Sequence, residues 1–548
     1  MAEAKKRWSP LDTIEFIGNK LPDPAILFLI GALLVMALSQ VAVSLKLGVQ
    51  PKAIQQVVDS ATGEVTGTVL VDKGDPITPV SLLTADGIFW CLSSMVKNFT
   101  GFAPLGVVLT GMLGIGVAER TGFIGALLKG FMLVVPRSLV TPTMVFLGIM
   151  SSMAVDAGYI VLPPIAAALY KSLGRSPLAG IAAVFAGVAA GFNANLFVTG
   201  LDPMLSTLTE AGASVIDPNY KVTPTCNWLF MIASTILITL IGWGVSVWIV
   251  ERRFENKSVE DGGPVPASSG DLEAQRLTKP ETRALFASIG AFLVLLSIII
   301  ALVFWKDSPL YGQDPAPPKF DRWVAVIVPL MMLCFVTPGG VYGILMGKIK
   351  GSRDFADLFA QSMANMAPII VLAFFAAQFI EYFKHSKLDV MLAHWGGGQL
   401  AQADLSPSAL MVAFIVVTLL FNLIIGSMSA KYTMFAPIFV PMFMMVGISP
   451  ELTQASYRIG DSVTNCITPL NSYLIIILVF MRQFVPKSGM GSLIAMMLPY
   501  SIAFAIAWTI LLVVWINLGI TLGIPSESGP LRYIPAQPIP VVDGAPAS

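Results

Sequence analysis

The sequence predicts an all-α polytopic membrane protein in which nine transmembrane helices and two re-entrant hairpins form an inverted repeat. Composition is the first observation behind this prediction, because 55% of the 548 residues are hydrophobic and only 12% are charged. Soluble proteins carry about 25% charged residues, and the mean hydropathy here is +0.78. The second observation is a series of uncharged stretches long enough to cross ~30 Å of hydrocarbon. The third is a sequence pattern in the first half of the chain that recurs in the second half.

Continuous apolar runs exclude a β-barrel, whose strands would alternate instead. The net charge of zero gives no indication of a nucleic-acid partner. The two histidines lie outside any HExxH pattern, so a zinc protease is not expected. The cysteines show no metal-ligand spacing and are interpreted as packing residues without a disulfide framework. No cofactor is expected beyond a coupling ion.

Nine segments are predicted to span the bilayer. The basic N-terminus, Ala4 to Arg7, precedes an apolar stretch of about 21 residues that is too long for a signal-peptide core. Residues 46–100 form a polar loop that ends in an amphipathic stretch, and 251–284 form a charged linker. The tail from Ile524 is rich in Pro, Ser and Gly and is expected to be disordered. The predicted spans are 24–44, 103–119, 178–199, 226–250, 286–305, 322–346, 366–384, 450–478 and 495–520.

Two apolar regions, 139–171 and 406–447, are interrupted by a polar, helix-breaking centre. The centres run from Ser151 to Gly158 and from Gly426 to Tyr432. Half-helix, polar tip and half-helix are typical of a re-entrant hairpin, whose tip must face protein or a water-filled cavity. The alternative is a pair of complete spans joined by an external turn.

An internal repeat favours the hairpins. When 162–178 is aligned with 435–451, an offset of 273, five of 17 positions are identical, whereas chance gives about one. Ala103-Pro104 and Ala367-Pro368 open corresponding spans, and Gly191 to Asn195 aligns with Gly460 to Thr464. The identical pairs are Pro164/Pro437, Ile165/Ile438, Gly174/Gly447, Ser176/Ser449 and Pro177/Pro450.

The positive-inside rule orients the chain. With the N-terminus in the cytoplasm and 122–136 and 389–400 treated as interfacial segments, the repeats run in opposite directions. The first hairpin then opens to the cytoplasm and the second to the outside. The basic residues placed inside are Arg120, Arg252, Arg253, Lys348, Lys350, Arg353, Arg482 and Lys487.

The resulting organisation has five parts. Residues 1–102 hold the first span and a periplasmic loop, and 103–250 hold repeat one. Residues 251–365 hold the cytoplasmic linker and two spans, 366–520 hold repeat two, and 521–548 form a disordered periplasmic tail. The expected location is the bacterial inner membrane.

Inverted repeats with broken helices place a binding site near the bilayer midplane. The span that begins near Pro450 carries Arg458 and Asp461 on one helical face and then breaks at Asp461 to Pro469. Its counterpart breaks from Asn193 and Asn195 to Asp202-Pro203. Charges within a membrane are costly and functional by default.

Each of these residues has a simpler structural interpretation. Arg458 and Asp461 would form an ion pair that holds the broken helix, and Asp202 would belong to a turn at the membrane edge. Asp156 and Lys431, at the hairpin tips, would cap half-helices. Glu119 and Glu381 end spans and are expected to be interfacial.

The segments Ser427 to Ile438, Tyr457 to Asn465 and Ile467 to Leu470, together with Gly191 to Leu196 and Asp202, resemble the p-aminobenzoyl-glutamate transporter (AbgT) family. The resemblance extends from about residue 8 to residue 520. It implies nine spans, two hairpins and a homodimer with a solvent-filled bowl. It also implies transport of p-aminobenzoyl-glutamate and, in some members, export of sulfonamide antimetabolites.

Cavity residues of the family correspond here to Asp202, Ser429, Tyr432, Pro450, Arg458, Asp461 and Pro469. One position departs from the family, because Tyr432 stands where tryptophan is usual. A phenol still offers a ring face to an aminobenzoyl group and adds a hydroxyl.

We therefore expect a secondary transporter of a small-molecule solute, coupled to H⁺ or Na⁺. Arg458 offers a fork for a carboxylate or sulfonyl group, and Asp461 or Asp202 is a candidate proton acceptor. Na⁺ would bind near Asn193, Asn195, Thr464 and Asn465. Na⁺-coupled uptake of other dicarboxylate-like solutes is the alternative.

Two other classes of membrane protein fit the sequence less well than a transporter does. An intramembrane aspartyl protease lacks its motif, because Arg458-Ile459 precedes Gly460-Asp461. A channel is disfavoured by the paired hairpins, which suit alternating access.

Overall fold

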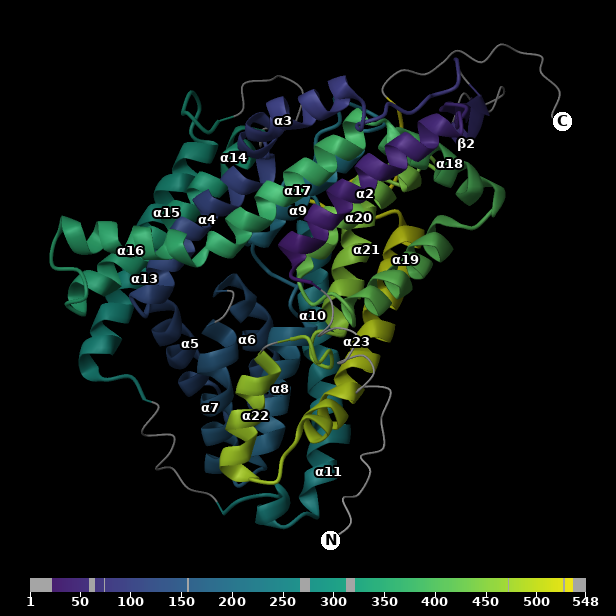
Figure 1. Cartoon of the computed structure of the whole chain (residues 1–548). Coiled ribbons are helices and arrows are strands. Elements are labelled where there is room, and N and C mark those ends of the chain that lie inside the picture. Colours follow the sequence, from purple (N-terminus) through teal and green to yellow (C-terminus); the bar gives the residue numbers. More distant parts are fainter. Residues whose placement is uncertain are drawn as a thin grey trace, which may run out of the picture.

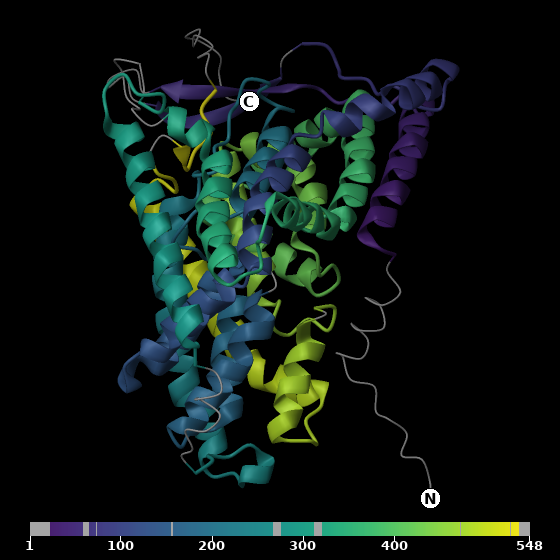
Figure 2. The same cartoon turned by 90° about the vertical axis from the view of Figure 1, so that its left-hand side faces the viewer.

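Long helices dominate the protein, and Figures 1 and 2 show them from two directions. The computed structural model describes residues 22–58, 65–72, 74–154, 157–266, 276–311, 321–471, 473–525 and 528–535. In chain order, the helices are α2 (Pro24–Ser44), α3 (Ala85–Thr100), α4 (Ala103–Arg120), α5 (Phe123–Val134), α6 (Val140–Met150), α7 (Ala157–Ser172), α8 (Pro177–Phe185), α9 (Leu201–Ala213), α10 (Trp228–Val245), α11 (Arg252–Glu255), α13 (Lys279–Phe304), α14 (Asp321–Ala325), α15 (Ile327–Leu345), α16 (Ser352–Asn365), α17 (Ala367–His385), α18 (Leu388–Gln402), α19 (Pro407–Asn422), α20 (Met428–Met444), α21 (Pro450–Val463), α22 (Tyr473–Phe484) and α23 (Met490–Leu518).

The predicted class is confirmed, because seven helical segments in the described part of the chain are long and apolar enough to cross a membrane. They correspond to seven of the nine predicted spans. The other two, 178–199 and 450–478, are the interrupted helices α8–α9 and α21–α22. The count of nine crossings stays a prediction. The seven segments are Pro24–Ser44, Ala85–Arg120, Trp228–Glu255, Lys279–Phe304, Ile327–Leu345, Ala367–His385 and Met490–Leu518.

The interrupted helices extend further than predicted. Helix α9 lies beyond the predicted end at residue 199, and α22 reaches Phe484 instead of residue 478. The polar sequence of α9 hides it from a hydropathy criterion. It is nevertheless buried, because it packs against α20 and α4 within the protein.

The helix pairs of the two predicted hairpins occupy opposite halves of the molecule, as an inverted repeat requires. In Figure 1, α6 and α7 lie in the lower half and α19 and α20 in the upper half. The interrupted helices run in opposite senses between these levels, since α8 and α22 lie low while α9 and α21 lie high. Asp156, in the predicted first tip, lies outside the described residues.

The identities between the repeats encode one tight turn. Gly174 and Gly447 adopt left-handed φ values of 70° and 77°, which an L side chain enters only with strain. The hydroxyls of Ser176 and Ser449 then cap α8 and α21, and a proline follows each at the first helical position. The repeat therefore conserves the geometry that links each hairpin to its interrupted helix.

The polar regions contain more structure than predicted. In the 46–100 loop, strands β1 (Lys52–Val58) and β2 (Val65–Asp72) form an antiparallel pair in which Lys52 faces Asp72, and α3 follows. The helical run from α10 continues through a π-helical segment to Glu255, so the linker begins later than expected.

The tail is not disordered throughout. Residues 528–535 cover the start of α21, where the Pro530 carbonyl accepts a hydrogen bond from the Ser449 hydroxyl (2.6 Å). The Tyr533 ring packs against Tyr220, and Arg532 pairs with Ile448 as a β-bridge. The Pro-, Ser- and Gly-rich composition of the tail does not predict these contacts with the rest of the protein. Residues 536–548 lie outside the described part of the chain.

Helix α21 is the core of the fold. All 14 of its residues are buried, although the helix carries Glu451, Arg458 and Asp461. It packs against α9, α19, α20 and α23, so protein surrounds its polar side chains.

We predict that Gly447→Ala lowers the thermal unfolding midpoint, because a left-handed conformation costs an L residue about 1–2 kcal/mol. The measurement is a melting curve of the detergent-solubilised protein. Gly351→Ala is the control, because Gly351 has an extended φ of −164° and a Cβ added there would meet open space. Equal midpoints for the two variants would contradict the role assigned to the turn.

Candidate functional site

Two interruptions in the middle of the protein carry its main buried polar groups. Helix α8 ends in the π-helical turn Ala186–Ala190, and the chain is irregular until α9 begins at Leu201. Helix α21 ends at Val463, and α22 begins at Tyr473. Irregular backbone at membrane depth needs protein or water around it, so these segments mark the candidate site.

A buried ion pair joins the two repeats between the interruptions. Nη1 of Arg458 in α21 lies 2.5 Å from Oδ1 of Asp202 in the first turn of α9. Arg458 is 1% exposed and Asp202 is 6% exposed. The other oxygen of Asp202 accepts hydrogen bonds from the amide (2.6 Å) and hydroxyl (2.9 Å) of Thr199. Asp202 therefore provides an acceptor for the backbone N–H of Thr199, just before α9, and compensates the charge of Arg458.

A second buried ion pair lies within the second repeat. Nζ of Lys431, in the first turn of α20, is 2.8 Å from Oδ1 of Asp461 near the end of α21. Both side chains are buried. The Lys431 ammonium also donates to Oδ1 of Asn422 and to the Ile425 carbonyl (3.4 Å). A carboxylate, an amide oxygen and a backbone carbonyl thus surround this cation.

Asn193 connects the two ion pairs. Its Nδ2 donates to Oδ2 of Asp461 (3.0 Å), and its backbone carbonyl accepts from Nη2 of Arg458 (3.0 Å). Its Nδ2 also donates to the hydroxyl of Ser462 (2.7 Å). Asn193 and Ser462 are equivalent positions in the aligned repeats, so the two halves of the site meet here. We refer to Asp202, Lys431, Arg458 and Asp461 as the four-charge network.

The structure corrects two of the simpler interpretations. Arg458 and Asp461 do not pair with each other, because each finds its partner on a different helix. Asp202 does not form a turn at the membrane edge but is buried in the network. Charge pairing across α9, α20 and α21 compensates every member, which a buried charge requires.

The four predicted Na⁺ ligands do not converge. Asn193 belongs to the network, whereas Oδ1 of Asn195 accepts from the Ser152 hydroxyl of the first hairpin (2.7 Å). The side-chain oxygens of Thr464 and Asn465 both accept from Nδ2 of Asn422, at 2.8 Å each. Asn195 and Asn465 therefore fasten each interruption to its own hairpin in this conformation.

Tyr432 does not present an open ring face. Its side chain is fully buried, and its ring centroid lies 4.3 Å from that of Tyr457. Its hydroxyl is 2.5 Å from the Thr209 hydroxyl, which in turn donates to Gln454 (2.6 Å). The hydroxyl that distinguishes tyrosine from tryptophan is therefore used to connect α20 with α9 and α21.

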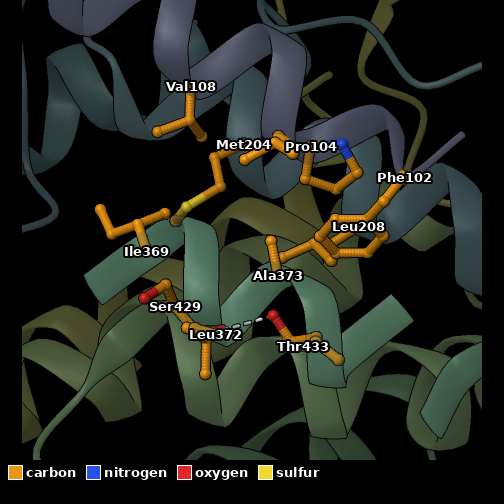
Figure 3. Close-up of a pocket in the computed structure, with 12 residues that line it drawn as sticks. Phe102, Pro104, Val108, Met204, Leu208, Ile369, Leu372, Ala373, Ser429 and Thr433 are labelled. Atoms are coloured by element: carbon orange, nitrogen blue, oxygen red, sulfur yellow. Dashed lines mark hydrogen bonds between the residues drawn. The ribbon is translucent and has the colours of Figure 1, made fainter. Parts of the chain in front are cut away.

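Ser429 lies on a small cavity between two groups of helices, α4 and α9 on one side and α17 and α20 on the other (Figure 3). The cavity volume is about 30 Å³, which is enough for roughly one water molecule. Ser429 and Thr433 supply its polar side chains. The remaining lining is apolar: Phe102, Pro104, Leu105, Val108, Met204, Leu208, Ile369, Leu372, Ala373 and Ala376.

The two predicted site prolines serve the backbone. Pro450 is the first residue of α21, about 12 Å along the helix from Arg458 at 1.5 Å per residue. Pro469 lies in the second interruption and is half-buried. Pro450 begins α21 and Pro469 lies in the interruption after it, and neither belongs to the four-charge network.

Lys431 and Asn422 are the residues that the predicted site omitted. Both are polar residues within the apolar segment 406–447, and a half-helix cap is the simpler alternative that the sequence offers for Lys431. Its complete burial follows the rule that a charge at membrane depth faces the protein interior and pairs there. Applied to the sequence, that rule is sufficient to place Lys431 in the predicted site.

Three buried polar atoms around the interruptions have no hydrogen-bond partner among the described residues. They are Nε of Arg458, Oδ1 of Asn193 and Nδ2 of Asn195. Buried donors and acceptors are nearly always satisfied. These atoms are therefore positions where water or a bound solute would find partners.

Interrupted helices and a charge network where the repeats meet are features of membrane transporters. The sequence matches the profile of the AbgT putative transporter family over residues 10–529. The chain belongs to this family and is a transporter, not an enzyme.

The similar proteins agree with this assignment. The p-aminobenzoyl-glutamate transport protein of Escherichia coli (strain K12) is 30% identical over 515 residues, which cover 93% of this chain and 95% of that protein. The YdaH transporter of Alcanivorax borkumensis superimposes with a TM-score of 0.82 at 38% identity, covering 92% of this chain and 100% of that one. MtrF of Neisseria gonorrhoeae, described with a class of antimetabolite efflux pumps, gives 0.81 at 39%, covering 92% and 97%.

We predict that Asp202→Asn destabilises the protein by about 3–5 kcal/mol, because it leaves Arg458 as an uncompensated buried charge. Adding Arg458→Gln should recover part of this loss. The control is Glu210→Gln, which breaks an exposed pair with Lys221 worth about 0–1 kcal/mol. Additive effects of Asp202→Asn and Arg458→Gln on unfolding would contradict the pairing.

Proposed function

We propose that this protein is a proton-coupled secondary transporter of p-aminobenzoyl-glutamate-like solutes, meaning aromatic amides that carry carboxylates. The observation that carries the proposal is Arg458, a buried guanidinium between the repeats whose only carboxylate partner among the described residues is Asp202. Similarity to the E. coli p-aminobenzoyl-glutamate transport protein supports the substrate class.

Arg458 suits a carboxylate or sulfonyl ligand. Guanidinium N–H groups form a planar fork that binds a carboxylate through two parallel hydrogen bonds. Nη1 contacts Asp202 and Nη2 contacts the Asn193 carbonyl, while Nε has no partner among the described residues. A solute carboxylate would bind by taking the place of Asp202.

Proton coupling follows from this replacement. An anion that displaces Asp202 leaves a buried carboxylate without its cation, and desolvation then favours its protonated form. Protonation of Asp202 in turn releases Arg458 for the anion. Proton binding and anion binding therefore favour each other, and we propose that the two move together.

Lys431 favours a proton over Na⁺ as the coupling ion. Its ammonium lies among a carboxylate oxygen, an amide oxygen and a backbone carbonyl, the oxygen types that a hard cation prefers. Because the Lys431 ammonium already compensates the negative charge of Asp461, Na⁺ is not required beside that carboxylate.

Access requires relative movement of the two groups of helices around the Ser429 cavity. A volume of about 30 Å³ is too small for an aminobenzoyl-glutamate, since pockets for drug-sized ligands measure roughly 300–1,000 Å³. We propose that α4 and α9, from repeat one, separate from α17 and α20, from repeat two, to admit the solute. Movement of one repeat unit against a scaffold is the usual route to alternating access.

We also propose that the protein is a homodimer in the bacterial inner membrane, with the N-terminus in the cytoplasm and the C-terminus outside. Charge supports the orientation, because α11, the end of α22 and the α22–α23 connection share the lower end in Figure 1 and carry Arg252, Arg253, Arg482 and Lys487. Labelling of single cysteines at residues 253 and 531 with an impermeant reagent tests the sidedness.

In proteoliposomes, labelled p-aminobenzoyl-glutamate should accumulate when the source side is acidic, and replacing Na⁺ by choline should change nothing. Arg458→Ala should reduce flux at least about 100-fold, while Arg120→Ala, at the end of α4 and away from the four-charge network, should retain it. Absence of flux with folded protein would contradict the substrate. Stimulation by the opposite pH gradient would show exchange, and a Na⁺ requirement would favour the alternative of Na⁺-coupled dicarboxylate uptake.

Lys431→Met should abolish transport driven by a pH gradient, because it leaves Asp461 without its ammonium partner. Lys384→Met, which removes a cation from the last turn of α17, is the control. Counterflow at equal pH separates binding from coupling in both variants. Full gradient-driven transport by Lys431→Met would contradict the role of Lys431.

A further inference from the structure

A cavity of about 320 Å³ lies at the end of the protein opposite the 46–100 loop. Its lining comes from the start of α8, α11 and the segment after it, α22, the α22–α23 connection and the start of α23. Helices α11 and α22 share the lower end in Figure 1. None of its lining residues belongs to the four-charge network or the interruptions. We refer to it as the basic cavity.

The basic cavity has an apolar floor and a cationic rim. Phe254, Met481, Val485 and Met496 line it and are buried. Three exposed cations, Arg253, Lys257 and Lys487, stand around it, with Asp261 as the one acidic lining residue. The lining therefore carries a net charge of +2, from three cations and one anion.

The three cations are available to a ligand. Arg253 uses one N–H to donate to the Ala495 carbonyl (3.0 Å), and Lys257 Nζ lies 4.7 Å from the Phe254 ring centroid. No salt bridge joins Arg253, Lys257 or Lys487 to a carboxylate in the part of the chain that the structure describes. Asp261 accepts instead from the Ser258 hydroxyl (2.9 Å).

The basic cavity lies where two candidate membrane spans end. The span Trp228–Glu255 ends beside it and the span Met490–Leu518 begins there, so hydrocarbon starts within a few residues. Above it, the two spans expose large apolar side chains, with Trp248 67% and Ile502 52% exposed. A tryptophan at this depth is typical of the membrane interface.

These features select an amphiphilic anion. A free phosphate would meet the cations but leave the buried apolar floor without a partner, whereas a zwitterionic headgroup would bring a cation against the basic rim. We propose that the basic cavity binds the phosphate headgroup of an anionic phospholipid such as phosphatidylglycerol, with its acyl chains along α10 and α23. Each basic group near a membrane surface strengthens such binding.

The bound headgroup would connect the ends of the two repeats. Helix α11 follows repeat one, whereas the α22–α23 connection belongs to repeat two, and both supply rim cations. A shared phosphate would offset their mutual repulsion and hold these ends together. The site is independent of the transported solute, so its test does not depend on the proposed substrate.

Native mass spectrometry of the full-length, delipidated protein measures the binding of phosphatidylglycerol, phosphatidylcholine and inorganic phosphate. We expect phosphatidylglycerol to bind at least about tenfold more tightly than phosphatidylcholine, and millimolar phosphate not to displace it. The combined variant Arg253→Gln, Lys257→Gln, Lys487→Gln should lose this preference by about tenfold or more. The matched control is Lys348→Gln, Lys350→Gln, Arg353→Gln, which removes three exposed cations elsewhere.

A second variant fills the cavity without changing its charge. Ser492 lines it and is exposed, so Ser492→Trp should also weaken phosphatidylglycerol binding. Equal binding of the two phospholipids, an unchanged preference in the cavity variants, or an equal loss in the matched control would overturn the proposal. Displacement by inorganic phosphate would assign the site to the free anion and would overturn the lipid.

Discussion

Pairing of four charges in the middle of the bundle is the constraint on which the rest of the structure depends. Asp202, Lys431, Arg458 and Asp461 lie on three different helices and compensate each other in two ion pairs. Removing one partner of a buried pair costs several kcal/mol. Any movement that separates α9, α20 or α21 must therefore replace a charge partner with a proton, a solute or water, which makes the network a natural point of control.

The surrounding fold holds this network without exposing it. Helix α21 is buried along its whole length, because other helices supply the apolar surface that lipid meets. Asn193 joins the two pairs and contacts its repeat equivalent Ser462. The inverted repeat thus brings polar segments from far apart in the chain to one point, and the left-handed glycines with their Ser-Pro caps fix how each hairpin enters its interrupted helix.

Much of this arrangement could be predicted from the sequence. Polar tips within apolar runs indicate the hairpins, Pro469 and the Asn-rich segment indicate the interruptions, and the 273-residue offset indicates the repeat. The choice of partners could not be predicted, because Asp202 and Arg458 are 256 residues apart and meet only through the packing of the two repeats. Helix α9 and the ordered part of the tail were missed because neighbouring elements, rather than their own hydropathy, hold them in place.

Proton uptake on solute binding tests the central claim most directly. p-Aminobenzoyl-glutamate is added to the solubilised protein in weak buffer, and the pH change is recorded by a dye. The account predicts uptake of about one proton per solute bound, and binding without proton uptake in Asp202→Asn. Binding without proton uptake by the wild-type protein, or undiminished uptake in Asp202→Asn, would contradict the exchange of partners at Arg458.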